Sequence, residues 1–300
     1  MIKKNSLNIF INFYFGLINY FKKIYQNSNF YEKRISKTSN NSFDYKPSPH
    51  LLSSIIKYHK KKYKIEDFVI ESIWKNEISL KDYEKINNFF WFFSLDLKSS
   101  KKTSQEIITK WINNNGKYKK ESWEFDITAK RIISWLSNHQ LTYEDSDKEY
   151  RSIFDHMVQK QTNHLINEIK NSKKLENKMI GCAAIILTGL AYKNEKGYLD
   201  NGLNFLKNII KSSIDNQGFP KSRNIRQLIF YLKYFIIIRE WFKESQSLIP
   251  EYIDETIYYL GSSYAFIWQN IKQDIFFNGN FSSENKEFDQ YLKRFGYTFK

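Results

Sequence analysis

Glycine and proline are too scarce in this chain to build a protein of many strands. The 300 residues include 10 Gly and 4 Pro, whereas a sandwich or barrel needs turn residues at intervals of roughly 8–12 positions. The hydrophobic share of 41% and the aromatic share of 18% exclude a chain that is disordered over most of its length. The sequence therefore predicts a folded protein built mainly of helices.

Nine segments repeat apolar residues at intervals of three and four positions, which is the spacing of one helical face. These segments are Leu51–His59, Tyr83–Leu97, Ser104–Asn113, Phe125–His139, Asp147–Ile169, Lys178–Tyr192, Tyr198–Ser212, Ile225–Lys243 and Glu251–Ile271. The breaks between them are short, so consecutive helices are expected to be antiparallel neighbours. Residues Ile65–Ile70 fit a strand or an irregular segment equally well.

Two of the predicted helices are apolar on more than one side. They contain the runs Met179–Leu190 and Leu228–Ile238, a composition typical of helices buried between two layers. Small residues such as Gly181 and Gly189 would let neighbouring helices approach closely. We therefore expect a double layer of helical hairpins, which can close into a toroid.

The first 26 residues form a separate unit in the pattern. Lys3 and Lys4 precede an apolar run from Ile9 to Phe21, which is shorter than the roughly 20 residues that span a bilayer. Residues 1–26 are therefore predicted as an amphipathic helix that packs on the protein or lies on a membrane surface, with a signal anchor as the third interpretation. Because no cleavage site follows, a cytoplasmic location is favoured and a periplasmic one stays open.

The next segment reads as a connector. Residues 27–48 are rich in Asn, Ser and Lys and lack an apolar period, and Pro47 and Pro49 mark the end of the segment. This composition predicts a linker. Residues 49–300 would then form one helical domain.

The formal net charge of +15 would attract a polyanion such as nucleic acid, anionic lipid or an acidic polysaccharide. Arg occurs only seven times among the 47 basic residues, although Arg is the residue best suited to read phosphate and base edges. The runs Lys60–Lys62 and Lys101–Lys102 are short, so a nucleic-acid partner is disfavoured. An AT-rich coding bias is an equal explanation for most of the excess Lys.

The sequence contains no pattern of a nucleotide-binding loop, zincin helix, hydrolase elbow or paired cysteine. Cys182, the single cysteine, is expected to be a small core side chain. His164 and Glu168 lie four positions apart, but two ligands without a third are weak evidence for a metal. No catalytic residue, metal or cofactor is predicted. Helix caps explain three aspartates better than acid and base roles do, namely Asp126, Asp145 and Asp147.

Two clusters remain as candidate binding sites. In the first, Arg131 and Trp135 are four residues apart on one predicted helical face, an arrangement that could stack against and pair with an acidic sugar. The alternative places Trp135 in the core with Arg131 paired locally. The second is the polar loop of residues 215–224 between two apolar helices, where the candidate binding residues are Lys221, Arg223 and Asn224.

Over residues 87–297 the chain resembles the N-terminal helical half of the heparinase II/III family. The matching motifs are Trp123, Thr128–Trp135, Leu187–Leu190, Gly218–Asn224 and Phe277–Gly279. The resemblance implies an incomplete (α/α) toroid that is followed in family members by a β-sandwich half. It also implies β-elimination of uronic-acid-containing polysaccharides in a cleft between the two halves.

At the positions that carry catalysis in the family, this chain departs from the pattern. The resemblance expects an Asn-His pair where the chain has Glu176 and Asn177, and a Tyr where it has Gln227. An amide cannot exchange a proton near neutral pH. The chain also ends at Lys300, before the expected β half, so we expect no eliminase activity from this chain alone.

The leading hypothesis is a toroid that binds an acidic polysaccharide, or the helical half of a polysaccharide lyase. The alternative is a helical module without enzymatic activity that docks a partner β-sandwich protein or a membrane surface. Both hypotheses share the all-α fold.

Overall fold

The computed structural model describes residues 2–39, 41–53, 79–193, 196–269, 275–277, 280–282 and 286–299. The undecided segment Ile65–Ile70 and most of the predicted helix Leu51–His59 lie outside the described residues. Of the latter, the structure describes a short helix, α3 (Pro49–Ser53).

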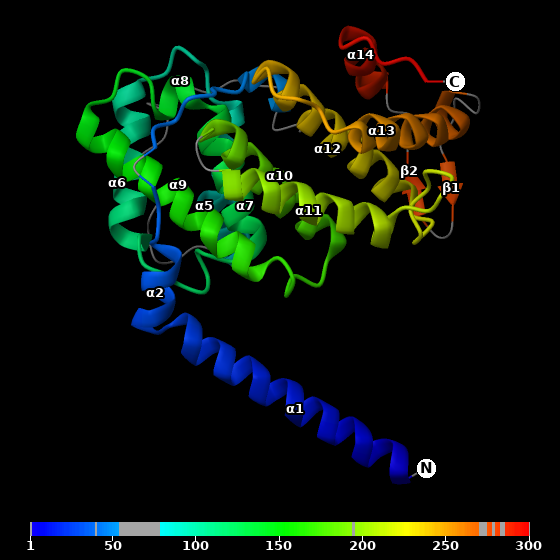
Figure 1. Cartoon of the computed structure of the whole chain (residues 1–300), viewed down its shortest axis with the longest axis horizontal. Coiled ribbons are helices and arrows are strands. Elements are labelled where there is room, and N and C mark those ends of the chain that lie inside the picture. Colours follow the sequence, from blue (N-terminus) through cyan, green and yellow to red (C-terminus); the bar gives the residue numbers. More distant parts are fainter. Residues whose placement is uncertain are drawn as a thin grey trace.

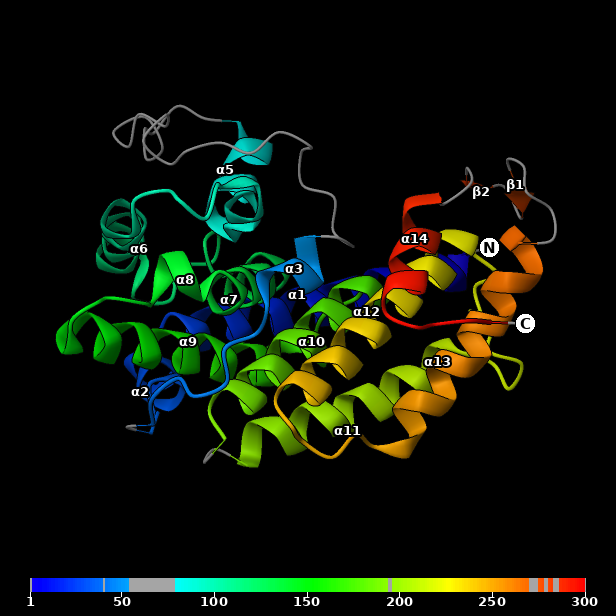
Figure 2. The same cartoon turned by 90° about the horizontal axis from the view of Figure 1, so that it is seen from above.

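Three antiparallel helical hairpins form the body of the protein (Figure 1). Each pairs an inner helix with the outer helix that follows it. The pairs are α7 (Phe125–Ser137) with α9 (Lys148–Glu168), α10 (Leu175–Ala191) with α11 (Lys196–Ser213), and α12 (Ile225–Glu244) with α13 (Glu251–Tyr264). The inner helix α10 packs against both α7 and α12, and Figure 2 shows α10 and α12 running side by side. This arrangement confirms the predicted all-α fold of an incomplete (α/α) toroid.

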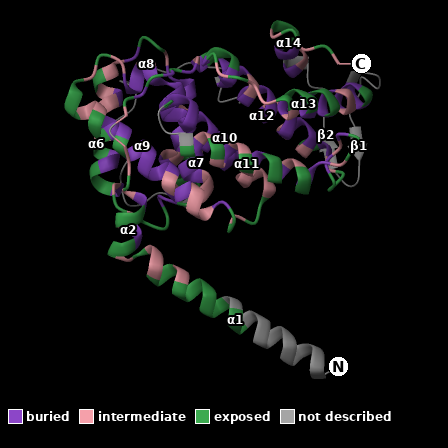
Figure 3. Ribbon diagram, viewed as in Figure 1, coloured by how far each residue is buried: buried purple, intermediate pink, exposed green. Residues whose placement is uncertain are grey.

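Close contact between the layers depends on small residues of α10. A methyl group added at Gly181 would lie 2.3 Å from the Phe125 ring, and one added at Gly189 would lie 2.5 Å from the backbone of Leu199. Every residue from Met179 to Ala191 is buried, as the purple colour of α10 shows in Figure 3. The prediction of an inner layer is therefore confirmed.

The polar segment after the first helix is packed and not a free linker. Helix α1 (Ile2–Gln26) is followed by α2 (Asn29–Ile35), which buries Tyr31 and Ile35. Residues 41–48 then cross the body as an extended segment, which we call the strap. The Asp44 N–H donates to the Ala191 carbonyl at 2.9 Å, and Tyr45 Oη donates to Glu244 Oε2 at 2.8 Å. The structure thus differs from the predicted linker because aromatic side chains within it find partners on the toroid.

Other predicted helices are divided or extended. The segment Tyr83–Leu97 forms α5 (Leu80–Asn88) and the short 3₁₀ helix η2 (Phe90–Ser94), separated by Phe89 with φ 58°. The segments Ser104–Asn113 and Phe125–His139 correspond to α6 (Lys101–Asn115) and to α7 with the short α8 (His139–Thr142). The left-handed conformation of Phe89 ends α5 because the chain must turn there.

The C-terminal part contains elements that the sequence pattern did not predict. Helix α13 continues into a π-helical turn, η3 (Ala265–Gln269). Strands β1 (Ile275–Phe277) and β2 (Asn280–Ser282) pair antiparallel with Phe276 opposite Phe281, and α14 (Lys286–Arg294) follows. Within the described part of the chain, no helix combines the length and the apolar character needed to cross a membrane.

Candidate functional site

The three inner helices begin at the same end of the toroid. Gln227, in the first turn of α12, donates from Nε2 to Oε1 of Glu176, in the first turn of α10, at 2.6 Å. Gly181 of α10 lies against Phe125, the first residue of α7. Backbone N–H groups at a helix start carry a partial positive charge, and at this end they meet the carboxylates of Asp126 and Glu176 in the first turns of α7 and α10.

Ser222 completes a short hydrogen-bond chain at this end. Its hydroxyl donates to Oε1 of Gln227 at 2.6 Å, which leaves the amide nitrogen of Gln227 directed at Glu176. Gln227 and Glu176 occupy the positions where the family resemblance expects catalytic groups. The structure places the two side chains in contact, and neither residue is the one expected there.

A cleft of about 420 Å³ adjoins the start of α10. Its walls come from the C-terminal part of α1, the segment before α7, the end of α9 and the first turn of α10. Lys120, Lys173 and Lys174 are exposed at this cleft, and Asn177 is half-buried in it. Other residues that line the cleft include Lys22, Trp123, Glu124 and Glu168. Lysines thus outnumber carboxylates around an opening beside a helix start.

Arg131 does not reach this cleft because it is completely buried. Its Nε donates to Gln161 Oε1 at 2.7 Å, and its Nη1 donates to the carbonyls of Asn87 at 2.7 Å and Ser122 at 3.0 Å. The guanidinium also lies over the Trp111 ring. The side chain therefore connects α7 to α9, to α5 through Asn87, and to the segment before α7 through Ser122.

Trp135 is also fully buried. Its ring packs edge-to-face against Phe89 and Trp111, with centroid distances of 5.3 and 5.5 Å, and its indole N–H has no hydrogen-bond partner among the described residues. The two residues do lie on one helical face, as expected, but that face is in the core. The structure favours the interpretation with Trp135 in the core and Arg131 paired locally, and a sugar cannot contact either side chain in this conformation.

The polar loop of residues 215–224 is organised by Asp215. One carboxylate oxygen accepts from the N–H groups of Gln217 and Phe219 at 3.0 and 2.9 Å, and the other accepts from Arg223 at 2.6 Å. Gly218 has φ 76° and lies against the backbone of Tyr259. The loop therefore has one defined conformation.

The structure brings Lys221, Arg223 and Asn224 together in this loop, and each has a local contact. Lys221 donates to the Lys211 carbonyl at 2.7 Å, and the side chain of Asn224 caps α12 by accepting from the Arg226 N–H at 2.9 Å. The side chain of Arg223 is 50% exposed while it pairs with Asp215. Arg223 thus presents its guanidinium at the surface.

His164 and Glu168 do not face one ligand. The His164 ring contacts Tyr31 Oη at 2.7 Å through Nδ1 and the Trp123 carbonyl at 2.8 Å through Nε2, and Glu168 pairs with Lys22 at 2.5 Å. Burial lowers the pKa of His164 to about 4. The described residues contain no cluster of three or more His, Cys, Asp or Glu that could hold a metal.

The contacts of Cys182 and of the candidate helix caps Asp147 and Asp126 indicate structural roles. Cys182 is buried beside the Gly202 carbonyl, and burial raises the pKa of its thiol, so it is not a nucleophile at neutral pH. Asp147 caps α9 by accepting from the Tyr150 N–H at 2.7 Å, as predicted. Asp126 lies in the first turn of α7 and pairs with Lys130.

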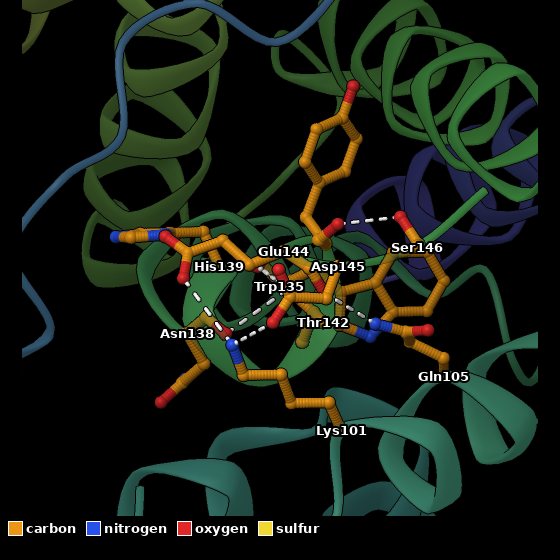
Figure 4. Close-up of polar contacts among 10 residues, drawn as sticks. Lys101, Gln105, Trp135, Asn138, His139, Thr142, Glu144, Asp145 and Ser146 are labelled. Atoms are coloured by element: carbon orange, nitrogen blue, oxygen red, sulfur yellow. Dashed lines mark hydrogen bonds and ion pairs between the residues drawn. The ribbon is translucent and has the colours of Figure 1, made fainter. Parts of the chain in front are cut away.

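Asp145 belongs to a polar cluster around α8, which Figure 4 shows. Lys101 pairs with Asp145 at 2.6 Å, His139 Nδ1 lies 2.9 Å from Glu144 Oε1, and Gln105 donates to the Glu144 carbonyl at 2.9 Å. Asp145 is therefore not a helix cap, since its carboxylate pairs with Lys101. These contacts hold the first half of α6 against the turn after α8, so we interpret the cluster as structural.

The residues that motif reasoning missed are Lys173, Lys174 and Asn177. They gave a detectable signal, because two adjacent lysines directly precede a strongly apolar helix. A positive pair at a helix start opposes the usual preference for acidic residues there. The first turn of α10 itself carries Glu176, in line with that preference.

Comparison with known proteins supports the fold. No protein-family model matches the chain, and no curated protein matches it either. The crystal structure of heparinase III superposes with a TM-score of 0.55 and 14% sequence identity over 88% of this chain and 48% of that chain. The chain thus shares its helical fold with heparinase III and spans about half the length of that protein.

Proposed function

We propose that this chain binds an acidic polysaccharide at the end of the toroid where α7, α10 and α12 begin. The observation that carries the proposal is the hydrogen bond between Gln227 and Glu176, at 2.6 Å. It joins the two positions that the resemblance assigns to the catalytic cleft of a family acting on uronate polysaccharides. The fold shared with heparinase III supports an acidic polysaccharide as the class of ligand.

Binding without elimination fits the residues at these positions. β-Elimination needs a group that removes or delivers a proton within hydrogen-bond reach of the sugar. Gln227 cannot do so, and its amide is already engaged by Ser222 and Glu176. Glu176 is an acceptor in this pair and would repel a uronate at close range.

The charges around the cleft suit recognition of a carboxylated sugar. Lys120, Lys173 and Lys174 are exposed beside the start of α10, and lysine ammonium groups attract carboxylates without demanding one geometry. Asn177 offers an amide for sugar hydroxyls. The loop extends the same surface, because Ser222 contacts Gln227 and Arg223 is half exposed next to it.

Titration with a uronate oligosaccharide at low and moderate salt tests the proposal. The informative variants are Lys173→Ala/Lys174→Ala and Arg223→Ala. A matched control is Lys102→Ala/Lys243→Ala, which removes the same charge from exposed positions on α6 and at the C-terminal turn of α12. We expect the first pair to weaken binding by about tenfold or more, as for two lost charge-assisted contacts, while the control changes it less than about twofold.

The cleft variant and the control variant could lose affinity equally, with both affinities falling in parallel as salt rises. That outcome would attribute binding to the diffuse charge of the chain. That result would overturn the polysaccharide proposal. The interaction-module hypothesis with a β-sandwich partner would then lead.

A further inference from the structure

Helix α1 exposes an apolar face with no counterpart elsewhere in the described body. It projects away from the toroid (Figure 1) and is largely exposed where its side chains are described (Figure 3). Phe13 and Phe21 are each 64% exposed, and spacings of three and four residues place the apolar residues on one side of the helix. Further exposed members of this face are Tyr14, Leu17, Ile18, Tyr20 and Ile24. A continuous exposed face with this many large apolar side chains indicates a binding partner.

Only the C-terminal end of α1 is fixed to the body, as far as its described side chains show. Lys22 pairs with Glu168 at 2.5 Å, and the Tyr25 ring packs on Tyr31 with a centroid distance of 5.2 Å. Arg34 donates to Tyr25 Oη at 3.1 Å. These contacts orient the helix, and they leave Phe13, Leu17, Ile18, Tyr20, Phe21 and Ile24 exposed.

The charge of α1 determines which partner fits. The 25-residue helix contains Lys3, Lys4, Lys22 and Lys23 and has no Asp or Glu. Its length is about 37 Å at 1.5 Å per residue, and it is too polar to cross a bilayer. A wide apolar face with lysines at both ends is the composition of a helix that lies in a membrane interface.

We propose that α1 lies flat on an anionic lipid surface and holds the toroid at that surface. The aromatic and aliphatic face would enter the boundary between headgroups and acyl chains, and the lysines would contact anionic headgroups. A second copy of this chain is a poorer partner for the same face, because two such helices would place like charges together. The proposal does not depend on the polysaccharide site.

Vesicle flotation tests this proposal with the full chain. The probes are vesicles of phosphatidylcholine alone and vesicles with phosphatidylglycerol added. The variant Phe13→Glu/Phe21→Glu places charges in the apolar face, and Leu248→Glu/Tyr258→Glu is the matched control at side chains of the body that are 93% and 64% exposed.

We expect wild type and the control to float with anionic vesicles, and the α1 variant to lose binding by about tenfold or more, since two large apolar side chains no longer enter the membrane interface. Binding should be weaker to phosphatidylcholine alone and should fall with salt. Circular dichroism of all three proteins checks that the toroid stays folded.

Equal flotation of wild type and the α1 variant would overturn the proposal. A second result would also overturn it: wild type forms a dimer in light scattering and does not bind vesicles, and the α1 variant forms no dimer.

Discussion

The guanidinium carbon of Arg131 lies 3.9 Å from the centroid of the Trp111 ring, and both side chains are fully buried. Burial lowers the pKa of Arg131, and hydrogen bonds to Gln161 and to two backbone carbonyls offset part of the desolvation cost. Arg131 is therefore a core residue, although arginine is a residue type usually found at the surface.

The first prediction follows from these contacts. Arg131→Met keeps an apolar side chain over Trp111 but leaves the carbonyls of Asn87 and Ser122 without their donor. We expect the free energy of unfolding to fall by about 3–5 kcal/mol, because each buried unpaired acceptor costs about 1–3 kcal/mol. Urea unfolding measures it, with the exposed Lys102→Met as control. Equal midpoints for Arg131→Met and wild type would contradict the buried network.

The second prediction concerns pH and His164. A neutral ring satisfies both of its contacts, with Nε2–H donating to the Trp123 carbonyl and Nδ1 accepting from Tyr31, and burial favours that neutral form. Its folded pKa is about 4, against a usual value of 6.5. As pH falls from about 6.5 to about 4, the unfolded chain binds a proton that the folded protein does not, and stability falls by on the order of 3 kcal/mol.

His164→Gln provides the comparison, because an amide can donate to Trp123 and accept from Tyr31 without titrating. Urea unfolding at pH 7 and pH 4.5 should show a smaller loss in the variant than in wild type. Identical losses in both proteins would assign the acid sensitivity to other groups.

The third prediction uses two glycines with opposite surroundings. Gly218 has φ 76° and its added methyl group would lie 2.5 Å from the Tyr259 carbonyl carbon, whereas Gly197 in α11 has nothing within 4 Å. Gly218→Ala should destabilise the protein by about 1–3 kcal/mol, and Gly197→Ala should be neutral or stabilising by up to about 1 kcal/mol. Melting temperatures of the two variants measure the difference. A tolerated alanine at Gly218 would show that the loop is not fixed against α13.

The fourth prediction is that the purified chain forms no unsaturated uronate products. Gln227 stands where the resemblance expects a proton-transferring Tyr, and its side chain is held by Ser222 and Glu176. Absorbance of the unsaturated product on a panel of acidic polysaccharides measures elimination, with heparinase III as positive control. Product formation above background would show that another residue transfers the proton.

The hairpins of the toroid could be predicted because their pattern is local. From Met179 to Ala191, helix α10 is apolar on more than one side and every residue is buried, so composition alone indicates its layer. The strap could not be predicted, because Phe43 and Tyr45 are isolated aromatics in a polar segment. Their partners, such as Tyr143, Tyr192 and Glu244, lie a hundred residues or more later in the chain, and no local period indicates such contacts.

The candidate site was predictable only in part. The spacing of Arg131 and Trp135 correctly places both on one face, but spacing does not say whether that face meets solvent or another helix. The deciding contact is Trp111 of α6. By contrast, the loop residues Lys221, Arg223 and Asn224 are near one another because they are adjacent in sequence, and their partners, such as Asp215, are local too.

The strap also has a consequence for biosynthesis. Tyr45 and Ser48 of the N-terminal part bind Glu244, at sequence separations of 199 and 196 residues. At translation rates of about 5–20 residues per second, roughly 10–40 s pass between synthesis of the strap and synthesis of its last partner. Until then its aromatic side chains are available to chaperones, and α1 emerges from the ribosome before the rest of the protein can fold. The strap is made well before Glu244 and is thus among the last segments to reach its final place.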